Sequence, residues 1–317
     1  MNPGHTTAIC LAVTLWAAPV SCGRADGADP AAPAVEVHFA FSKVMFGDVN
    51  ENDALAAIRV YTQSIADQNG IYVNNRPALL DGTNAILQEV EHKRSDIFVL
   101  TAEEFFTLEN LGLEGPYLIA ENHGSSSEEF LLLTRTDGAV RRVEDLQGCK
   151  LNVSSDFRSG LSRMWLAVLC REHGLGPPEQ ALGRITAAAK PAQVILPVFF
   201  GQADACIATR TGWAVMGELN PQLAQQLRVI AVSPPVVPTV TCFRAGFTAA
   251  FRQQCATAML MSATKPAFKQ ILVMFKTDEL ACQPAAVLES TRALVADYHR
   301  LGAETNAPPV EAERRGP

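Results

Sequence analysis

Short runs of β-forming residues alternate with longer amphipathic segments along this chain. Residues 35–41 alternate apolar with polar or small side chains and predict a first strand, and residues 53–68 carry the apolar spacing of a helix. Asp96–Leu100 predicts a buried strand, and residues 101–111 predict the helix that follows it. Alternation of this kind is typical of a mostly parallel sheet that is covered by helices on both faces.

The same alternation occurs a second time farther along the chain. Cys149–Val153 and Ala203–Ala208 predict buried strands, and residues 159–173 between them predict a helix that ends at Gly174. The chain therefore contains two α/β units, and we expect each of them to form one lobe.

A proline-rich segment interrupts the second unit. Ser233–Pro238 reads Ser-Pro-Pro-Val-Val-Pro, and each proline fixes φ and removes a backbone donor. One predicted strand, Thr239–Phe243, and a helical stretch to about Leu301 follow it. Because one strand needs a sheet to pair with, we expect this tail to return to the first unit. The chain then crosses between the lobes twice, near Glu121–Glu129 and near Ser233–Thr239.

These segments give a domain prediction. Residues 35–122 and 239–301 form lobe 1, and residues 123–238 form lobe 2 with the hinge segments. We expect residues 302–317 to be disordered, because they are polar and rich in proline. In α/β proteins of this kind a ligand binds at the carboxyl ends of the strands, here between the lobes.

The N-terminus predicts export. Thr7–Ser21 contains an apolar stretch with the length of a signal-peptide core, which is too short to span a bilayer. We expect a signal peptide over residues 1–22 and a flexible tether over residues 23–34. Val20-Ser21-Cys22 resembles the lipobox of bacterial lipoproteins, so both simple cleavage and acylation of Cys22 fit the sequence. No later apolar run is long enough to cross a membrane.

The chain has 8 cysteines, of which Cys10 and Cys22 fall in the predicted leader. None of the others forms a CxxC pair, which argues against a zinc ribbon or a thioredoxin-type site. Cys149 opens a predicted strand, and Cys170 lies near the end of the antiparallel helix that follows, so the two can meet. A disulfide between them is one prediction, and buried free thiols are the alternative.

Composition narrows the function. Of the 317 residues 48% are hydrophobic and 19% are charged, as in an ordinary globular protein, and the net charge is -7. The excess of acidic residues disfavours nucleic acid as a partner. The sequence contains no G-x-S-x-G, HExxH or P-loop motif, and its six histidines show no metal-ligand spacing. We therefore predict neither an enzyme nor a cofactor.

The loop Ser154–Gly160, which leads into a predicted helix, is the main candidate binding site. The first turn of a helix has unpaired N–H groups and a partial positive charge, and both attract anions. Ser154, Ser155 and Ser159 add hydroxyl donors, and Gly160 lets the backbone approach a ligand closely.

Two larger side chains in the same loop, Phe157 and Arg158, are further candidates for ligand contact. Arg158 suits a phosphate or carboxylate through its guanidinium fork, whereas Phe157 narrows the pocket or stacks on the ligand. The alternative is that Ser155 or Asp156 caps the helix and Arg158 faces water.

Further candidates follow other strand ends. Ser42 and Phe46 come after the first strand, Thr101 after the second buried strand, and Thr209 and Arg210 after Ala203–Ala208. Thr101 is also an ordinary N-cap residue, and Arg210 is either a second cation near the cleft or a surface residue. We interpret Thr83 as a helix cap only.

Four stretches in order carry a resemblance to a known family. They are Val143–Val153, Ser154–Gly160, Gly201–Ala208 and Ser233–Pro238, and the chain resembles the type II periplasmic solute-binding proteins, specifically the phosphate/phosphonate type that serves ABC importers. The resemblance covers roughly residues 35–301.

The resemblance implies a monomeric, periplasmic, two-lobed protein that closes on a small anion of the phosphate, phosphite or phosphonate type. Its partner is an ABC permease or, alternatively, a membrane sensor kinase, and an exported enzyme on the same fold is a further alternative. Phe157 and Arg158 stand where phosphonate binders often have Ser and Thr, so carboxylates also stay open as ligands.

Overall fold

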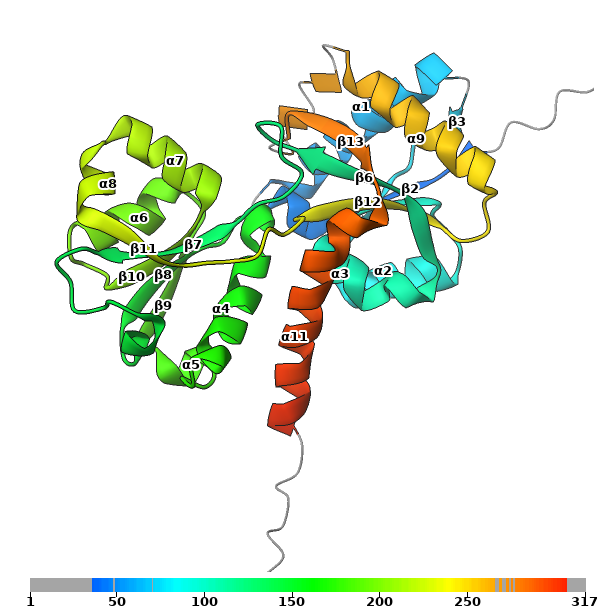
Figure 1. Ribbon diagram of the computed structural model, residues 1–317. Helices are drawn as coiled ribbons and strands as arrows, with labels where there is room; N and C mark the ends of the chain where they lie inside the picture. Colours follow the sequence, from blue (N-terminus) through cyan, green and yellow to red (C-terminus); the bar gives the residue numbers. More distant parts are fainter. Residues whose placement is uncertain are drawn as a thin grey trace, which may run out of the picture. The chain divides into compact units, whose positions relative to one another are not determined.

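The computed structural model describes residues 36–47, 49–69, 71–265, 268–269, 272–273, 275 and 277–306. Two sheets with their flanking helices account for most of these residues (Figure 1). A small parallel pair, β1 (Glu36–Val37) with β3 (Tyr72–Val73), stands beside them. Among the described residues no helix has the length and apolar character of a membrane span.

The first sheet has six strands in the order β13-β6-β12-β5-β2-β4. They are β2 (Phe39–Ser42), β4 (Ala78–Leu80), β5 (Ile97–Thr101), β6 (Leu113–Glu121), β12 (Thr239–Arg244) and β13 (Glu279–Gln283). β2 pairs in parallel with β4 and β5, whereas β12 pairs antiparallel with β5 and β6, and β6 pairs antiparallel with β13. We call this sheet and the elements packed on it the first lobe.

Helices cover the first sheet because their apolar faces match its buried strands. They are α1 (Glu51–Asn69), α2 (Thr83–Glu91), α3 (Ala102–Leu108) and α9 (Ala249–Ala263), with the 3-10 turns η1 (Lys43–Phe46), η2 (Glu109–Leu111) and η5 (Ala285–Leu288). The last helix, α11 (Glu289–Asn306), packs on α4 (Leu161–Glu172) as well as on α3. α9 packs on β6, β13 and α1, while α3 packs on β5 and β12. The strand β5 is buried over Ile97–Leu100, as its continuous apolar run predicts.

The second sheet has five strands in the order β11-β7-β10-β8-β9. They are β7 (Phe130–Arg135), β8 (Lys150–Ser154), β9 (Arg184–Ala188), β10 (Ala205–Thr209) and β11 (Leu227–Val232). Its other elements are η3 (Val143–Leu146), η4 (Phe157–Ser159), α4 (Leu161–Glu172), α5 (Pro178–Ala181), α6 (Pro191–Phe199), α7 (Arg210–Leu219) and α8 (Gln222–Gln226). Together they form the second lobe.

The α/β class and the two-sheet organisation agree with the sequence, but the prediction of mostly parallel sheets is wrong. In the second sheet β8 pairs in parallel with β9 and β10, yet β7 pairs antiparallel with both β10 and β11. β13 was expected to be helical, and it is instead an edge strand on β6. Its sequence, Glu-Leu-Ala-Cys-Gln, has little β preference, so its pairing partner decides its conformation.

The chain passes between the two sheets at residues 122–129 and 233–238, and these two segments are paired with each other. Glu128 and Val236 exchange two backbone hydrogen bonds of 2.8 Å. The Ser233 hydroxyl accepts a 2.8 Å bond from the Phe130 N–H, and Thr291 of α11 accepts one from the Val237 N–H. One apolar cluster runs from β5 through Val236 and Val237 to α4, so the core is continuous through the crossing.

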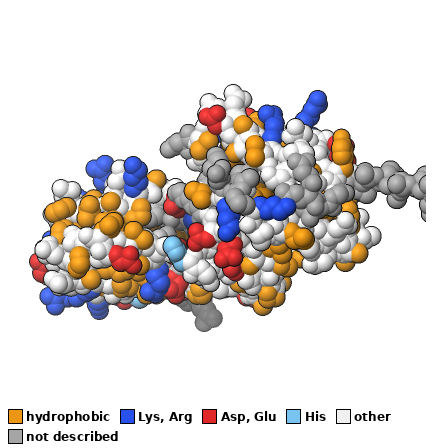
Figure 2. All heavy atoms as spheres, turned by 90° about the horizontal axis from the view of Figure 1, so that it is seen from above, with side chains coloured by type: hydrophobic (Ala, Val, Ile, Leu, Met, Phe, Trp, Pro, Cys, Tyr) orange, Lys and Arg blue, Asp and Glu red, His pale blue; other side chains and the backbone are white. Residues whose placement is uncertain are grey.

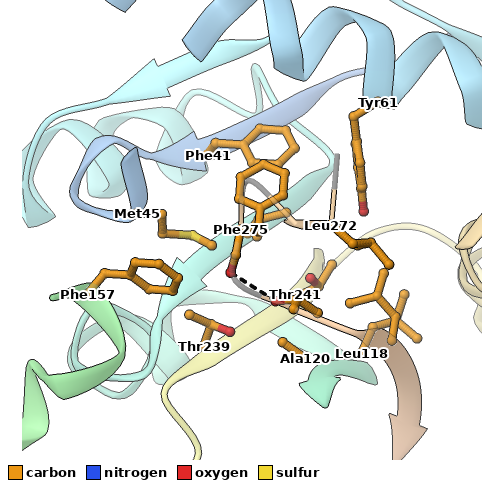
Figure 3. A pocket seen from close by; sticks show the side chains of 13 residues that line it. Phe41, Met45, Tyr61, Leu118, Ala120, Phe157, Thr239, Thr241, Leu272 and Phe275 are labelled. Carbon is orange, nitrogen blue, oxygen red and sulfur yellow. Dashed lines mark hydrogen bonds between the residues drawn. The ribbon is translucent and has the colours of Figure 1, made fainter. Parts of the chain in front are cut away.

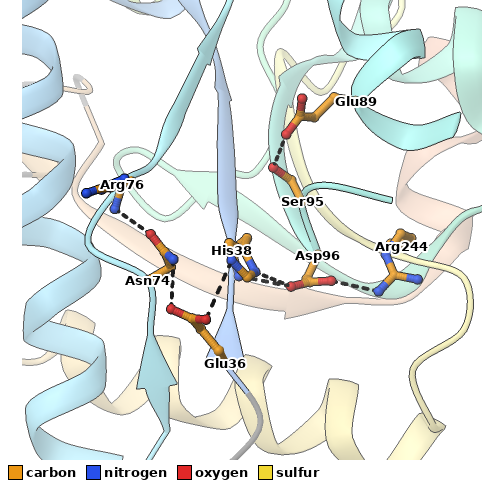
Figure 4. A network of polar contacts seen from close by, with 8 residues as sticks. All are labelled: Glu36, His38, Asn74, Arg76, Glu89, Ser95, Asp96 and Arg244. Atoms are coloured by element: carbon orange, nitrogen blue, oxygen red, sulfur yellow. Dashed lines mark hydrogen bonds and ion pairs between the residues drawn. The ribbon is translucent and has the colours of Figure 1, made fainter. Parts of the chain in front are cut away.

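A polar network fixes the strand ends that lie opposite the sequence-predicted ligand site (Figure 4). The buried Asp96 carboxylate accepts a 2.9 Å bond from the His38 N–H and a 2.8 Å bond from Arg244 Nη2. His38 precedes β2, Asp96 precedes β5, and Arg244 ends β12. A buried carboxylate with charged and backbone donors ties three strands together at this end.

The predicted disulfide between Cys149 and Cys170 is wrong, because both are free thiols, as are the other described cysteines. The Cys149 thiol donates to the Asp145 carbonyl at 3.3 Å, whereas Cys170 is buried in the apolar cluster of α4, where burial raises the pKa of its thiol to about 11. The expected signal peptide, tether and Cys22 lie outside the described residues. The helix predicted to end near Leu301 continues to Asn306 as α11, and residues beyond it are not described.

Candidate functional site

A cleft of about 830 Å³ is lined by residues of both lobes. Its first-lobe residues come from η1, the start of α2 and the start of α3, and its second-lobe residues come from η4, the start of α4 and the turn after β9. The lining comprises Val44, Met45, Phe46, Gly47, Val49, Gly82, Thr83, Thr101, Glu103, Glu104, Ser155, Asp156, Phe157, Gly160, Leu161, Ala189 and Pro238. The carboxyl ends of β2, β5, β8 and β9 all lead into this cleft, as expected for α/β sheets.

The first-lobe wall is organised around one buried carboxylate. Glu104 accepts hydrogen bonds from the Thr101 N–H at 3.0 Å, from the Thr101 hydroxyl at 2.9 Å and from the Ser42 hydroxyl at 2.8 Å. The Thr101 hydroxyl in turn accepts from the Glu104 N–H, which completes a capping box at the start of α3. Two strand ends and a helix are thereby held in one arrangement.

The second-lobe wall uses the same chemistry over a shorter span. Asp156 caps η4 by accepting from the Ser159 N–H at 2.9 Å and from the Ser159 hydroxyl at 2.8 Å. The Ser155 N–H donates to the Ala188 carbonyl at 3.1 Å, which joins the loop to the end of β9. Gly160 links η4 to α4 with helical backbone angles, so the N-terminal end of α4 opens at the cleft.

The side chains of Phe157 and Arg158, both in this turn, have different surroundings. Phe157 is partly buried against the aromatic cluster of the first lobe and lines the cleft. Arg158 is only 6% exposed, and among the described residues its Nη1 has no hydrogen-bond partner. Burial lowers the pKa of the Arg158 guanidinium, while Glu128, Asp156 and Asp278 act in the opposite direction.

Acidic side chains predominate among the charged residues that line the cleft. The lining contains Glu103, Glu104 and Asp156, and Glu104 and Asp156 already accept hydrogen bonds from the protein. Desolvation raises the pKa of Glu103, and the neighbouring Glu104 raises it further. On the face seen in Figure 2, acidic and basic side chains are interspersed among apolar and polar ones.

The structure separates the candidates from the sequence into two groups. Five of them line the cleft: Phe46, Thr101, Ser155, Phe157 and Gly160. Six stand outside its lining: Ser42, Ser154, Arg158, Ser159, Thr209 and Arg210. The Ser42 hydroxyl donates to Glu104, and the Ser159 hydroxyl donates to Asp156. The Ser154 carbonyl accepts from the Ser162 hydroxyl at 3.5 Å.

Thr209 and Arg210 lie at the start of α7, outside the lining of the cleft. Thr209 caps α7 by accepting from the Gly212 N–H at 3.0 Å. Arg210 is exposed and forms an ion pair with Glu129, and its N–H donates to the Glu129 carbonyl. Arg210 was expected to be either a second cation near the cleft or a surface residue. Its surroundings agree with a surface residue.

The sequence missed several residues of the lining. Met45, Glu104, Ala189 and Pro238 come from four separate segments, and all but Glu104 carry no motif of their own. Thr83 was interpreted as a cap, but Gly82 with φ of 80° is the N-cap of α2, and Thr83 lines the cleft as the first helical residue. The Thr-x-x-Glu spacing of a capping box was the available signal for Glu104.

The described residues contain no group of three or more His, Cys, Asp or Glu side chains arranged to hold a metal ion. The donors that face the cleft are hydroxyl and backbone N–H groups at helix starts, which are suited to oxygen-rich anions. The arrangement can thus bind a small anion between two walls, and the walls belong to different sheets.

A family model matches residues 54–281, and its description is "ABC transporter, phosphonate, periplasmic substrate-binding protein". No curated protein matches the chain.

Solved structures share the fold. A Xanthomonas citri protein bound to chloride is 17% identical, with 85% of this chain and 99% of that chain covered at a TM-score of 0.59. A binding protein component of a phosphonate ABC transporter from Pseudomonas aeruginosa is 15% identical, with 88% and 91% covered at 0.54. PhnD1 of Prochlorococcus marinus in complex with methylphosphonate is 11% identical, with 86% and 98% covered at 0.50. At these identities the likeness concerns the fold.

Proposed function

This chain belongs to the periplasmic substrate-binding family of phosphonate ABC transporters, and from that premise we propose that it captures a phosphate-, phosphite- or phosphonate-type anion in the cleft between its lobes. It is a solute-binding protein of an ABC importer, so its partners are a small ligand and a permease. The observation that carries the proposal is the 830 Å³ cleft, which is lined by both sheets and receives the N-terminal end of α4.

The anion is held by neutral donors and one buried cation. The hydroxyl groups of Thr83 and Ser155 and the first N–H groups of α2 and α4 supply hydrogen bonds and partial positive charge. Arg158 lies in the turn between Phe157 and Gly160, which both line the cleft, and its buried Nη1 is an unused donor among the described residues. An oxyanion that reaches this donor removes the cost of leaving it unsatisfied.

Binding is coupled to closure of the two lobes. Residues 122–129 and 233–238 are the two connections between the sheets, and their paired backbones make one hinge of them. A ligand that contacts both walls stabilises the closed form by its difference in affinity for the two forms. The closed form is then the one that docks on the permease.

Thermal unfolding tests the ligand class. The secreted protein is heated with inorganic phosphate, phosphite, methylphosphonate or acetate, and with chloride as the control. A ligand at 100 times its dissociation constant stabilises the folded state by about 2.7 kcal/mol. We expect at least one phosphorus anion to raise the unfolding temperature. A response to acetate alone makes the ligand a carboxylate, and no response to any anion contradicts the proposal.

Arg158 is tested by a matched pair of substitutions. Arg158→Ala removes the buried cation of the turn, whereas Arg210→Ala removes an exposed cation of the same lobe that is paired with Glu129. We expect Arg158→Ala to abolish the anion-induced shift while the ligand-free protein stays folded, and Arg210→Ala to retain the shift. An unchanged shift in Arg158→Ala would exclude Arg158 from the site.

Two further properties belong to this proposal. We expect binding without turnover and a monomer in solution. Incubation with phosphate monoesters and light scattering test them in that order, and released phosphate or a dimer mass would each contradict one of the two. Simple cleavage and acylation of Cys22 stay open as alternatives, and mass spectrometry of the N-terminal peptide distinguishes them.

A further inference from the structure

A small apolar cavity lies in the first lobe beside the cleft. Its volume is about 30 Å³, and its walls include Phe41, Met45, Tyr61, Leu118 and Phe157. Figure 3 shows Met45 and Phe157 on one side of it and Tyr61 and Leu118 on the opposite side. A space of about 10–15 Å³ in this measure holds one water molecule, so the cavity has room for one or two groups of methyl size.

Met45 and Phe157 line the cavity and the cleft at the same time. Met45 belongs to η1 of the first lobe and Phe157 to η4 of the second lobe, and these two turns are in contact. Phe157 packs on the first-lobe cluster that contains Phe41 and Tyr61. These two side chains therefore form a partition, and it is built from both lobes.

The two sides of the partition have different chemistry. The cleft side carries the hydroxyl groups of Thr101 and Ser155 and the carboxylates described above. The cavity side is mainly apolar, with Phe41 and Tyr61 in edge contact at 5.8 Å between ring centroids, and Thr239, Thr241 and Thr277 are its polar lining residues. A ligand with a charged head and a short apolar substituent can place its head on the cleft side and its substituent toward the cavity. An oxyanion without a substituent uses the cleft side alone.

We propose that the Phe157–Met45 partition sets the size of the apolar substituent that the protein accepts on its anionic ligand. The inference rests on the proposed function and adds the two residues that limit the alkyl group of a phosphonate ligand. The anionic head stays in the cleft, and the alkyl group packs against Phe157 and Met45 toward the cavity. Phe157 is the better determinant of the two, because it is only partly buried, whereas Met45 is 6% exposed.

The test measures dissociation constants by calorimetry for inorganic phosphate and for methyl-, ethyl-, propyl- and butylphosphonate. Each buried methylene group strengthens binding by about fourfold. For the wild type we expect affinity to rise as far as ethylphosphonate and to fall for longer chains. Phe157→Ala joins the cavity to the cleft, so we expect its affinity, expressed relative to its own affinity for inorganic phosphate, to keep rising through propyl- and butylphosphonate.

Two further variants keep the test decisive. Met45→Ala opens the partition from the first lobe and serves if Phe157→Ala fails to fold. Phe200→Ala removes a Phe of the second lobe that is 64% exposed and lines neither space, so we expect the wild-type profile. If phosphate binds but the chain-length profile is the same in the wild type and both partition variants, the inference is wrong. If the wild type binds none of these anions, the proposed function itself fails and the inference falls with it.

Discussion

The two walls of the cleft use one kind of carboxylate cap in two different ways. On the first-lobe wall Glu104 of α3 is buried and accepts from Ser42 of β2 and Thr101 of β5. On the second-lobe wall Asp156 is partly buried and accepts from the Ser159 N–H and hydroxyl within the same turn. Hydrogen bonds that join several elements fix tertiary structure, whereas hydrogen bonds within one turn fix that turn.

This difference assigns separate tasks to the walls. The first wall is a rigid surface, and the second wall carries the turn of Phe157 and Arg158 toward it. In the closure that we propose, a locally held loop moves against a scaffold that is fixed over a long range.

The largest effect is expected at Glu104. Glu104→Ala leaves buried donors of Ser42 and Thr101 without their acceptor, and this should lower the free energy of unfolding by about 3 kcal/mol. Urea denaturation measures it, and Glu104→Gln, which keeps the shape and one acceptor oxygen, should lose less. A loss no larger than that of the Asp156 variant would remove the distinction between the walls.

A smaller and more local effect is expected at Asp156. Asp156→Ala removes the cap of η4 and should lower the free energy of unfolding by about 1 kcal/mol, the usual cost of a lost N-cap. Asp156→Ser retains a capping oxygen and is the matched control. Hydrogen exchange should increase at residues 157–160 and stay unchanged in β5, and faster exchange in β5 would contradict a local role.

Glu103 sharpens the electrostatic side of the comparison. Its pKa is raised above the ordinary value of 4.5, so the folded state holds this proton more tightly than the unfolded chain. The free energy of unfolding therefore falls as pH rises from that value through the raised folded pKa, and anion affinity falls with it. Glu103→Gln should flatten both dependences when the unfolding temperature and phosphate binding are measured across this range. If the unfolding temperature and phosphate binding change with pH equally in the wild type and the variant, other groups cause these dependences.

The smallest effect is expected at Arg210. Its ion pair with Glu129 is exposed, so Arg210→Ala should change the free energy of unfolding by about 0.5 kcal/mol or less. The measurement is chemical denaturation at low and at high salt, where the small difference should shrink further. A loss comparable to that of Glu104→Ala would mean that the crossing segment depends on this pair.

The site could be predicted from the sequence only in part. Thr101 and three residues of the turn, Ser155, Phe157 and Gly160, line the cleft, and hydroxyl and glycine residues before a helix have a local signature. Thr209 and Arg210 have similar local patterns, yet Thr209 caps α7 and Arg210 pairs with Glu129 of the crossing segment. Met45, Ala189 and Pro238 reach the cleft from three separate segments, and no local pattern encodes such a meeting.

The sequence alone determined the α/β class, the order of most strands and helices, the two crossings and the family resemblance. These depend on periodicity, glycine and proline positions and short motifs, which act over a few residues. The tertiary structure decided the antiparallel pairing of β7 and β12, the strand conformation of β13 and the partners of Glu104. Those outcomes depend on which distant segments come together, because pairing and burial are energies of contact between elements and not of the elements themselves.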